Sequence, residues 1–358
     1  SLVSSSNGGA TVHAYGRKVP YHTYGIHPDG PITSLSGKPY SIMVEAGEAG
    51  MARALINSGS ICEPGTGVFV ASSAERNDTD HISRQIIESG VEIILSGGET
   101  QLLPEGMVGF HGDPGIREDG ENLIEYAREL GYTVVYTSEQ MMSLSPETER
   151  VLGVFAAEHT FNDKPEEELK RKDLPLYVET APTLAEMTAF ALKILEAKGK
   201  PFLLVVEEEG SDNFANDNNA AGTLEALRRA DQAIGIAMDY IDKHPKTMLI
   251  TAADSDAGGM KIMSVQDVED FEKPLPPVTD RGAPLDGFLG TGSLPFVAKP
   301  DKFGNEMRFG LAWVSGSDLG GGVIARCHGL NAGLLPANVD NTDIYRMMYA
   351  SLFGQWLW

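Results

Sequence analysis

Short strand patterns alternate with amphipathic helix patterns along most of this 358-residue chain. Runs of apolar and β-branched residues begin at Val91, Thr133, Val151, Pro201 and Thr247. Each run is short and almost continuously apolar, which is typical of strands in a parallel sheet covered by helices on both faces. The alternation predicts an α/β fold, a three-layer αβα sandwich with a largely parallel central sheet.

The sequence also predicts two helices and one segment that departs from the alternating pattern. One helix is expected to begin after Thr183, with Glu186 three residues later in a capping-box arrangement, and another is expected over residues 220–243. Residues 262–310 are rich in Pro, Gly and Asp, and we interpret them as an insertion or a long loop over the sheet edge. We therefore predict a single domain over residues 1–358 with an irregular insertion at about 262–310.

The charge of the chain excludes some partners. It has 28 Lys and Arg residues against 51 Asp and Glu residues, a net charge of −23. Such a chain repels a phosphate backbone, so we expect no nucleic-acid partner. No apolar run is long enough to span a bilayer. The cysteines, Cys62 and Cys327, are too few for a Cys-based zinc site, and their positions do not say whether they pair.

Two of the expected strands end in acidic clusters. The first cluster holds Glu207, Glu208, Glu209, Asp212 and Asp217, and the second holds Asp254 and Asp256. The carboxyl ends of parallel strands meet at one edge of a sheet, where ligand sites form. Carboxylates brought together there repel one another unless a cation offsets their charge. The pattern predicts a divalent-cation site, and the alternative is an acidic surface loop of an acidic protein.

The two acidic segments, V-E-E-E-G-S-D-N-F-A-N and T-M-L-I-T-A-A-D-S-D-A-G-G, resemble the metal-binding core of the alkaline phosphatase family. Further segments resemble that family in the same order along the chain: S-S-S-N-G-G-A-T, E-R-N-D, V-L-G-V-F-A-A-E-H, A-P-T-L-A-E-M-T and V-D-N-T-D-I-Y. The resemblance covers about residues 1–260 and 310–350. It implies a metal-dependent hydrolase that acts on small-molecule phosphate monoesters through a phosphoserine intermediate.

The resemblance also implies catalytic residues. Counting back from Gly16 places Ser6 at the nucleophile and Ser5 at the position of a neighbouring Asp, while Ser4 and Ser5 are alternatives if the register slips. Arg76, in E-R-N-D, matches the arginine that clamps the phosphate. Without the resemblance, the serines would be interpreted as a flexible terminus and Arg76 as part of a surface salt bridge.

The implied metal ligands are Glu63, Glu207, Asp212, Asn216, Asp254, Ser255 and Asp318. Asn216 and Ser255 stand where the family has His, and Asp318 is reached by counting back from the closing D-N-T-D, with His328 as the fallback. Additional candidates are Glu208, Glu209 and Asp256. His159 matches a family His outside the metal core, where a structural role is expected.

The implied ligands lack imidazole and thiolate. Oxygen donors suit hard cations, so we expect Mg²⁺, Ca²⁺ or Mn²⁺ rather than the Zn²⁺ of the wider family. The family's first strand ends in G-D-G, and no such segment precedes Ser6. We therefore expect the sheet to lack one central strand, and we interpret the sequence as truncated at its N-terminus.

Two other interpretations stay open. The chain could be a non-catalytic binding protein for divalent cations or phosphate on the same fold, or a hydrolase of phosphodiesters or sulfate esters from the same superfamily. The resemblance also implies a periplasmic or extracellular location, with the leader absent from this sequence. Homodimers are common in the family, which makes a homodimer a candidate assembly.

Overall fold

The computed structural model describes residues 5–265 and 272–358, and its centre is a parallel sheet of five strands in the order β3-β4-β2-β1-β5. The strands are β1 (Ala52–Ser60), β2 (Ile93–Gly97), β3 (Thr133–Val135), β4 (Val151–Val154) and β5 (Phe202–Glu207). Four of them match predicted runs, and the fifth run forms β6 (Met248–Thr251). The central strand β1 was not predicted.

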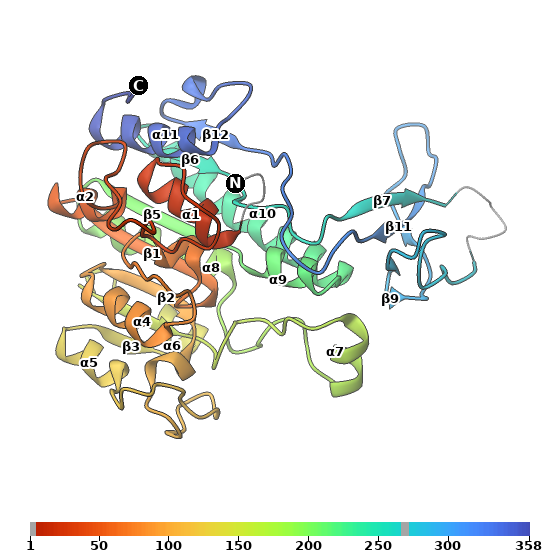
Figure 1. The fold of residues 1–358 in the computed structure, drawn as a ribbon, viewed down its shortest axis with the longest axis horizontal. Helices are drawn as coiled ribbons and strands as arrows, with labels where there is room; N and C mark the ends of the chain where they lie inside the picture. The colour runs from red at the N-terminus through yellow and green to blue at the C-terminus, as the bar shows by residue number, and fades with distance from the viewer. Residues whose placement is uncertain (1–4, 266–271) are drawn as a thin grey trace.

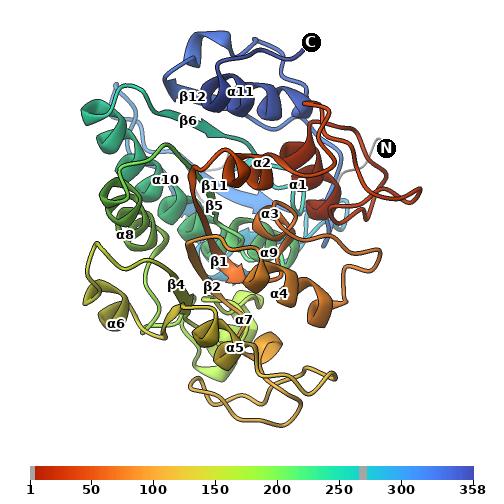
Figure 2. The same ribbon diagram turned by 90° about the vertical axis from the view of Figure 1, so that its left-hand side faces the viewer.

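Helices cover both faces of this sheet, which confirms the three-layer αβα fold (Figure 2). One face packs against α6 (Ser138–Met142), α8 (Leu184–Ala197) and α10 (Ala220–Lys243). The other packs against α1 (Ser6–Tyr15), α2 (Ile42–Glu48), α4 (Thr79–Glu88), α5 (Leu123–Glu129) and α11 (Asn341–Phe353). The sheet therefore separates two hydrophobic cores, one under each helical layer.

Both predicted helices are present. Helix α8 begins after Thr183, whose side chain and that of Glu186 form the expected capping box. Helix α10 has the predicted bounds, but Leu224 and Leu227 on it are exposed, and small residues such as Ala226 face the core instead. Small side chains on the inner face allow α10 to pack closely against α8 and α9 (Gly210–Asn216).

The central sheet is interrupted after β5. Among the described residues, β5 pairs with β1 on one side only, and β6 pairs only with β12 (Arg326–Gly329), in a separate two-stranded sheet. Helix α10 connects β5 to β6, and α11 packs on β6. Val205 of β5 and Ile250 of β6 pack against the same hydrophobic core. Within the part of the chain that the structure describes, no backbone pairing therefore joins β5 to β6.

Residues 261–265 and 272–312 form a second structure that projects from the body (Figure 1). Its strands are β7 (Lys261–Ser264), β8 (Leu285–Gly287), β9 (Gly290–Thr291), β10 (Phe296–Val297) and β11 (Arg308–Ala312). They form an antiparallel sheet in the order β10-β11-β8-β9, with β7 also paired to β11. The described part of the segment 262–310, which we expected to be irregular, thus forms a small folded lobe.

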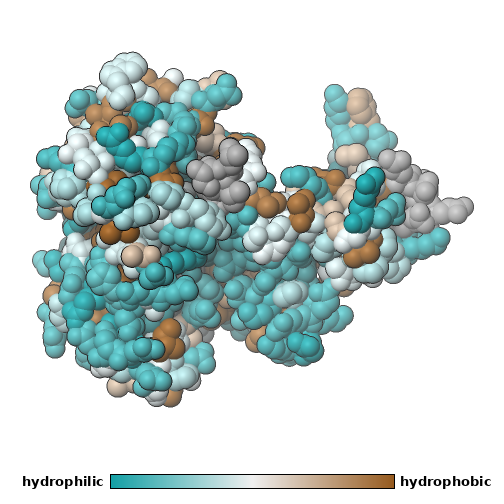
Figure 3. All heavy atoms as spheres, in the orientation of Figure 1, coloured by the Kyte–Doolittle hydropathy of each residue, from teal (hydrophilic) through white to brown (hydrophobic). Residues whose placement is uncertain are grey.

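The lobe is anchored at its base and apolar on its surface. Trp313 is fully buried, and its indole Nε1 donates to Asp286 Oδ2 at 2.7 Å. Phe288 and Phe303 are exposed on the lobe, where Figure 3 shows patches of apolar surface. Short α3 (Pro64–Gly67) and α7 (Glu166–Lys172) complete the helices named in Figures 1 and 2. None of the described helices combines the length and the apolar character of a bilayer-spanning segment.

Candidate active site

The carboxyl ends of β1, β5 and β6 lead into one site. Asn57 of β1 lies opposite Glu207 of β5 in the parallel register, and α3 follows β1 directly and packs on β5. Asp254 comes three residues after β6 ends, and Gly9 of α1 lies so close to it that a Cβ there would be 2.6 Å from Asp254 Cβ. The two acidic segments thus meet beside the N-terminal half of α1, as the strand-end argument predicted.

Six carboxylates interact at this place, and we call them the acid cluster. They are Glu63, Glu207, Glu209, Asp212, Asp254 and Asp318. Burial, followed by Asp254 and Glu63, raises the pKa of Glu207 well above its ordinary value. Burial, followed by Glu63 and Glu207, does the same to the pKa of Glu209. The fold therefore holds these acids together against their mutual repulsion.

The aspartates of the acid cluster behave in the same way. Burial and the neighbouring Asp318 raise the pKa of Asp212 to about 8. Burial and Asp318 also raise the pKa of Asp254 to about 6. A carboxylate with a raised pKa favours its protonated form, so a positive charge placed among these groups would stabilise the ionised forms.

Two amides hold members of the acid cluster. The Nδ2 of buried Asn57 donates to Glu207 Oε2 and, at 2.9 Å, to Thr66 Oγ1. The Nδ2 of Asn216 donates to both Asp212 Oδ2 at 3.0 Å and Asp318 Oδ1 at 2.9 Å. Asn216 Oδ1 accepts from the backbone N–H of Gly258 at 3.0 Å, which fixes the orientation of this amide. Asn216 therefore bridges two carboxylates by hydrogen bonds.

Arg76 joins the acid cluster to the start of α1. Its Nη2 lies 3.2 Å from Glu63 Oε2, and its Nη1 donates to Asn7 Oδ1 at 2.8 Å. Although burial lowers the pKa of Arg76, the surrounding carboxylates, Glu63 first, raise it further, so the guanidinium stays charged. Asn7 directly follows Ser6, the first residue of the helix. The structure thus brings the predicted clamp close to the predicted nucleophile.

The serines at the start of α1 have different surroundings. Ser5 is the N-cap, and its Oγ accepts from the backbone N–H groups of Gly8 and His22, both at 3.4 Å. Ser6 is buried, and within the described residues its Oγ has no hydrogen-bond partner. Ser4 lies outside the described residues. The hydroxyl of Ser5 thus caps the helix, whereas that of Ser6 does not.

Other predicted residues lie apart from the acid cluster or at its rim. Glu208 turns to Ser58 and Tyr177, whose hydroxyls donate to its Oε1 at 2.8 and 3.0 Å, and burial raises its pKa to about 7. Ser255 Oγ donates to Asp254 Oδ1 at 3.3 Å, so it supports a cluster member. His328 is on β12 and pairs with Leu249 of β6, away from the end of β6 that leads to Asp254.

Four further residues have structural surroundings. The backbone of Asp256 pairs with Leu319, which places the strand end beside the loop that holds Asp318. His159 Nδ1 accepts from the backbone N–H of Ser60 at 3.1 Å, and its ring stacks on that of Phe161, in keeping with the expected structural role. Cys62 and Cys327 are both free thiols.

The donor set fits a hard cation in chemistry but not in its present arrangement. All cluster donors are oxygens, and Asp212 Oδ1 is buried with no partner among the described residues. Yet across residues 5–265 and 272–358, no three His, Cys, Asp or Glu side chains are arranged to hold a metal ion. Arg76, Asn57 and Asn216 donate hydrogen bonds to carboxylate oxygens of the acid cluster.

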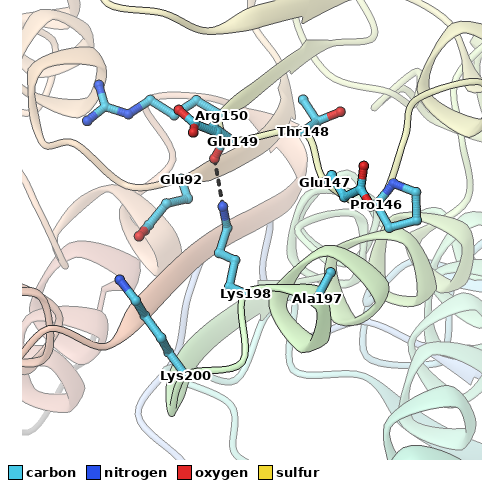
Figure 4. Close-up of a pocket in the computed structure, with 9 residues that line it drawn as sticks. All are labelled: Glu92, Pro146, Glu147, Thr148, Glu149, Arg150, Ala197, Lys198 and Lys200. Atoms are coloured by element: carbon cyan, nitrogen blue, oxygen red, sulfur yellow. Dashed lines mark hydrogen bonds between the residues drawn. The ribbon is translucent and has the colours of Figure 1, made fainter.

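A cavity of about 440 Å³ lies at the opposite edge of the sheet (Figure 4). Its lining includes Glu92, Arg150 and Lys200, which precede β2, β4 and β5, and Lys198, whose Nζ donates to the backbone oxygen of Glu149 at 2.8 Å. It therefore opens at the amino ends of the strands and takes no part in the site.

Sequence comparison decides the family. The family model described as alkaline phosphatase matches residues 1–271. The chain belongs to the alkaline phosphatase family. A membrane-bound alkaline phosphatase of Bombyx mori is 27% identical over 215 residues, which cover 52% of this chain and 36% of that protein. This family member spans half or less of the length of the curated relatives it matches.

Solved alkaline phosphatases share the fold. The enzyme of Thermus thermophilus superposes with a TM-score of 0.74 at 22% identity, covering 99% of this chain and 80% of that one. A TAB5 alkaline phosphatase mutant, with His replaced by Glu and Mg bound in the M3 site, gives a TM-score of 0.70 at 17% identity, covering 98% and 84%. At such identities these likenesses establish the fold of this alkaline phosphatase family member.

Proposed function

We propose that this family member hydrolyses small-molecule phosphate monoesters in a metal-dependent reaction, with Ser6 as nucleophile and Arg76 as phosphate clamp. The observation that carries the proposal is the contact between Arg76 and Asn7 at 2.8 Å, which sets a charged fork beside Ser6. Helix α1 adds to it, since Ser6 is its first residue and helix N-termini favour anions. Arg suits this task because its planar fork matches phosphate oxygens.

The proposed reaction has two displacements. Ser6 Oγ attacks phosphorus and loses its proton to solvent, the bond from phosphorus to the ester oxygen breaks, and the alcohol leaves after taking up a proton. Water then cleaves the phosphoserine, which restores Ser6 and releases inorganic phosphate. Arg76 holds the phosphoryl oxygens through both steps, and the absence of a partner for Ser6 Oγ in the described residues leaves it free to attack.

The proposed metal-holding residues are Glu63, Glu207, Asp212, Asn216, Asp254, Ser255 and Asp318, with Glu209 as a further neighbour. A bound divalent cation would supply positive charge for the phosphoryl and leaving oxygens. The raised pKa values of Glu207 and Asp212 support such a role, because a cation relieves the repulsion that causes them. The TAB5 mutant supports the choice of Mg²⁺, since replacing His by Glu there accompanies Mg in the M3 site.

A second function is favoured by one contact. Asn216 donates to both Asp212 and Asp318, so it already occupies oxygens that a cation would use. A protein that binds phosphate or a cation without turnover would tolerate this bridge. A hydrolase must open it when the cation binds.

The test is hydrolysis of an aryl phosphate at alkaline pH. The protein is stripped with chelator and resupplied separately with Mg²⁺, Ca²⁺, Mn²⁺ and Zn²⁺. We expect a hard cation to restore turnover where Zn²⁺ alone does not, and Ser6→Ala to abolish it. Ser5→Ala is the matched control, because it costs the cap about 1 kcal/mol but keeps the nucleophile. No turnover with any cation, or equal turnover in Ser6→Ala, contradicts the proposal.

We also propose a periplasmic or extracellular location and a homodimer, both on the strength of family membership. Cell fractionation tests the first, and light scattering of the purified protein tests the second. A cytoplasmic protein, or a monomer at micromolar concentration, would contradict them.

A further inference from the structure

Asn7 has surroundings that neither a surface residue nor a core residue would have. Its side chain is fully buried in the first turn of α1. Its Oδ1 accepts from Arg76 Nη1 at 2.8 Å, whereas its Nδ2 is buried without any partner among the described residues. The orientation follows from chemistry, because a guanidinium has only donors and must face the amide oxygen. The NH₂ group therefore points away from Arg76 and is unsatisfied.

An unsatisfied buried donor in such a place needs an acceptor. Buried polar groups are nearly always hydrogen-bonded, and an exception calls for a reason such as a ligand that completes the bond. Asn7 directly follows Ser6, and its side-chain oxygen accepts a hydrogen bond from the guanidinium of Arg76. The acceptor that fits between an amide NH₂ and a guanidinium is an anion oxygen.

We infer that Asn7 is a substrate-contacting and positioning residue: its Oδ1 orients the fork of Arg76, and its Nδ2 donates to a phosphoryl oxygen. This inference rests on the proposed function for the identity of the anion. Arg76 is then held by Glu63 on one nitrogen and by Asn7 on the other. The NH₂ of Asn7 and the N–H groups of Arg76 that Glu63 and Asn7 do not engage are the donors that we assign to the anion.

Binding of inorganic phosphate tests this role independently of turnover. The dissociation constant is measured by titration calorimetry with Mg²⁺ present, for the wild type, Asn7→Ala, Arg76→Ala and the double variant. Kinetic constants for an aryl phosphate are measured on the same proteins. We expect Asn7→Ala to weaken phosphate binding by about ten- to a hundredfold, the range for a hydrogen bond to a charged group. The double variant should bind more weakly than Arg76→Ala, because it also loses the Nδ2 donor, but by less than the product of the two single effects, because Asn7 acts partly through Arg76.

Asn7→Asp separates the two roles of Asn7. It keeps an oxygen toward Arg76 but replaces the NH₂ donor by an acceptor, so the thermal unfolding midpoint should stay level or rise while phosphate binding falls more than in Asn7→Ala. Phosphate binding within twofold of the wild type in either variant overturns the inference, as do effects of Asn7→Ala and Arg76→Ala that simply multiply. A wild type that binds phosphate without turnover contradicts the proposed function alone, and one that does neither contradicts both.

Discussion

Replacing Asp254 by Asn is expected to stabilise the metal-free protein at alkaline pH. Asp254 is half-buried, and burial together with Asp318 raises its pKa from 3.8 to about 6. A raised carboxyl pKa means that the folded state holds the proton more tightly than the unfolded chain does. The stability contributed by the protonated group is therefore present below about pH 4 and is lost as the pH rises through about 6.

The size of the effect follows from the same two values. The difference between 3.8 and about 6 corresponds to about 3 kcal/mol of unfolding free energy at pH 8, and to about 0.5 kcal/mol at pH 4. Asn carries no charge at either pH, and its amide oxygen can still accept from Ser255. Asp254→Asn should thus gain about 2–3 kcal/mol at pH 8 and less than about 1 kcal/mol at pH 4.

Urea unfolding in the presence of chelator measures this difference at the two pH values. Asp242→Asn is the matched control, because it removes the same charge from the exposed face of α10 and should change stability by about 0.5 kcal/mol or less. Saturating Mg²⁺ should make the wild type more stable than Asp254→Asn, because the wild type binds the cation through the Asp254 carboxylate, which the variant lacks. An equal gain at pH 4 and pH 8, or a loss at pH 8, would show that burial and Asp318 do not disfavour the ionised form of Asp254.

Two further predictions concern packing. Gly9→Ala should lower turnover by more than about tenfold, since its Cβ would lie 2.6 Å from Asp254 Cβ and force α1 to shift, whereas Gly235→Ala, in open space on α10, should leave turnover intact. Equal activities of the two variants would refute the close packing of α1. Asp286→Ala should lower the free energy of unfolding by about 1–3 kcal/mol, because it leaves the buried indole N–H of Trp313 unpaired. Urea unfolding and near-ultraviolet circular dichroism would detect this loss. Unchanged stability and an unchanged spectrum would mean that this bond does not anchor the lobe.

The strands that sequence patterns reveal are those with an apolar, β-branched run. Strands β2 to β6 have such runs, but β1, A-R-A-L-I-N-S-G-S, is built largely of small and polar residues. Its place between β2 and β5 gives it buried surroundings on both faces, and this is a property of the neighbours rather than of its own sequence. The lobe was missed for a related reason, because strands as short as Gly290–Thr291 show no periodicity.

The residues of the candidate site also differ in how far their own sequence segments could predict them. Ordered motifs pointed to Arg76 and to the acids at strand ends, because those residues carry recognisable chemistry at recognisable positions. They did not point to Asn57 or Asn7, whose importance depends on partners distant in the sequence: Asn57 contacts Glu207, and Arg76 contacts Asn7. For Asn57, nothing in its own segment indicates the carboxylate across the sheet.

The interruption between β5 and β6 divides the acid cluster mechanically. Glu207 is the last residue of β5, which is hydrogen-bonded to β1. Asp254 instead follows β6, which belongs to a two-stranded sheet in contact with α10 and α11. Side-chain packing opens more readily than a ladder of main-chain hydrogen bonds. The part of the acid cluster on β5 and the part that follows β6 can therefore move relative to each other. We expect the amides of β6 to exchange with deuterium faster than those of β1. A cation bound by both Glu207 and Asp254 would restrict this movement. It should therefore slow amide exchange in β6 more than in any strand of the five-stranded sheet.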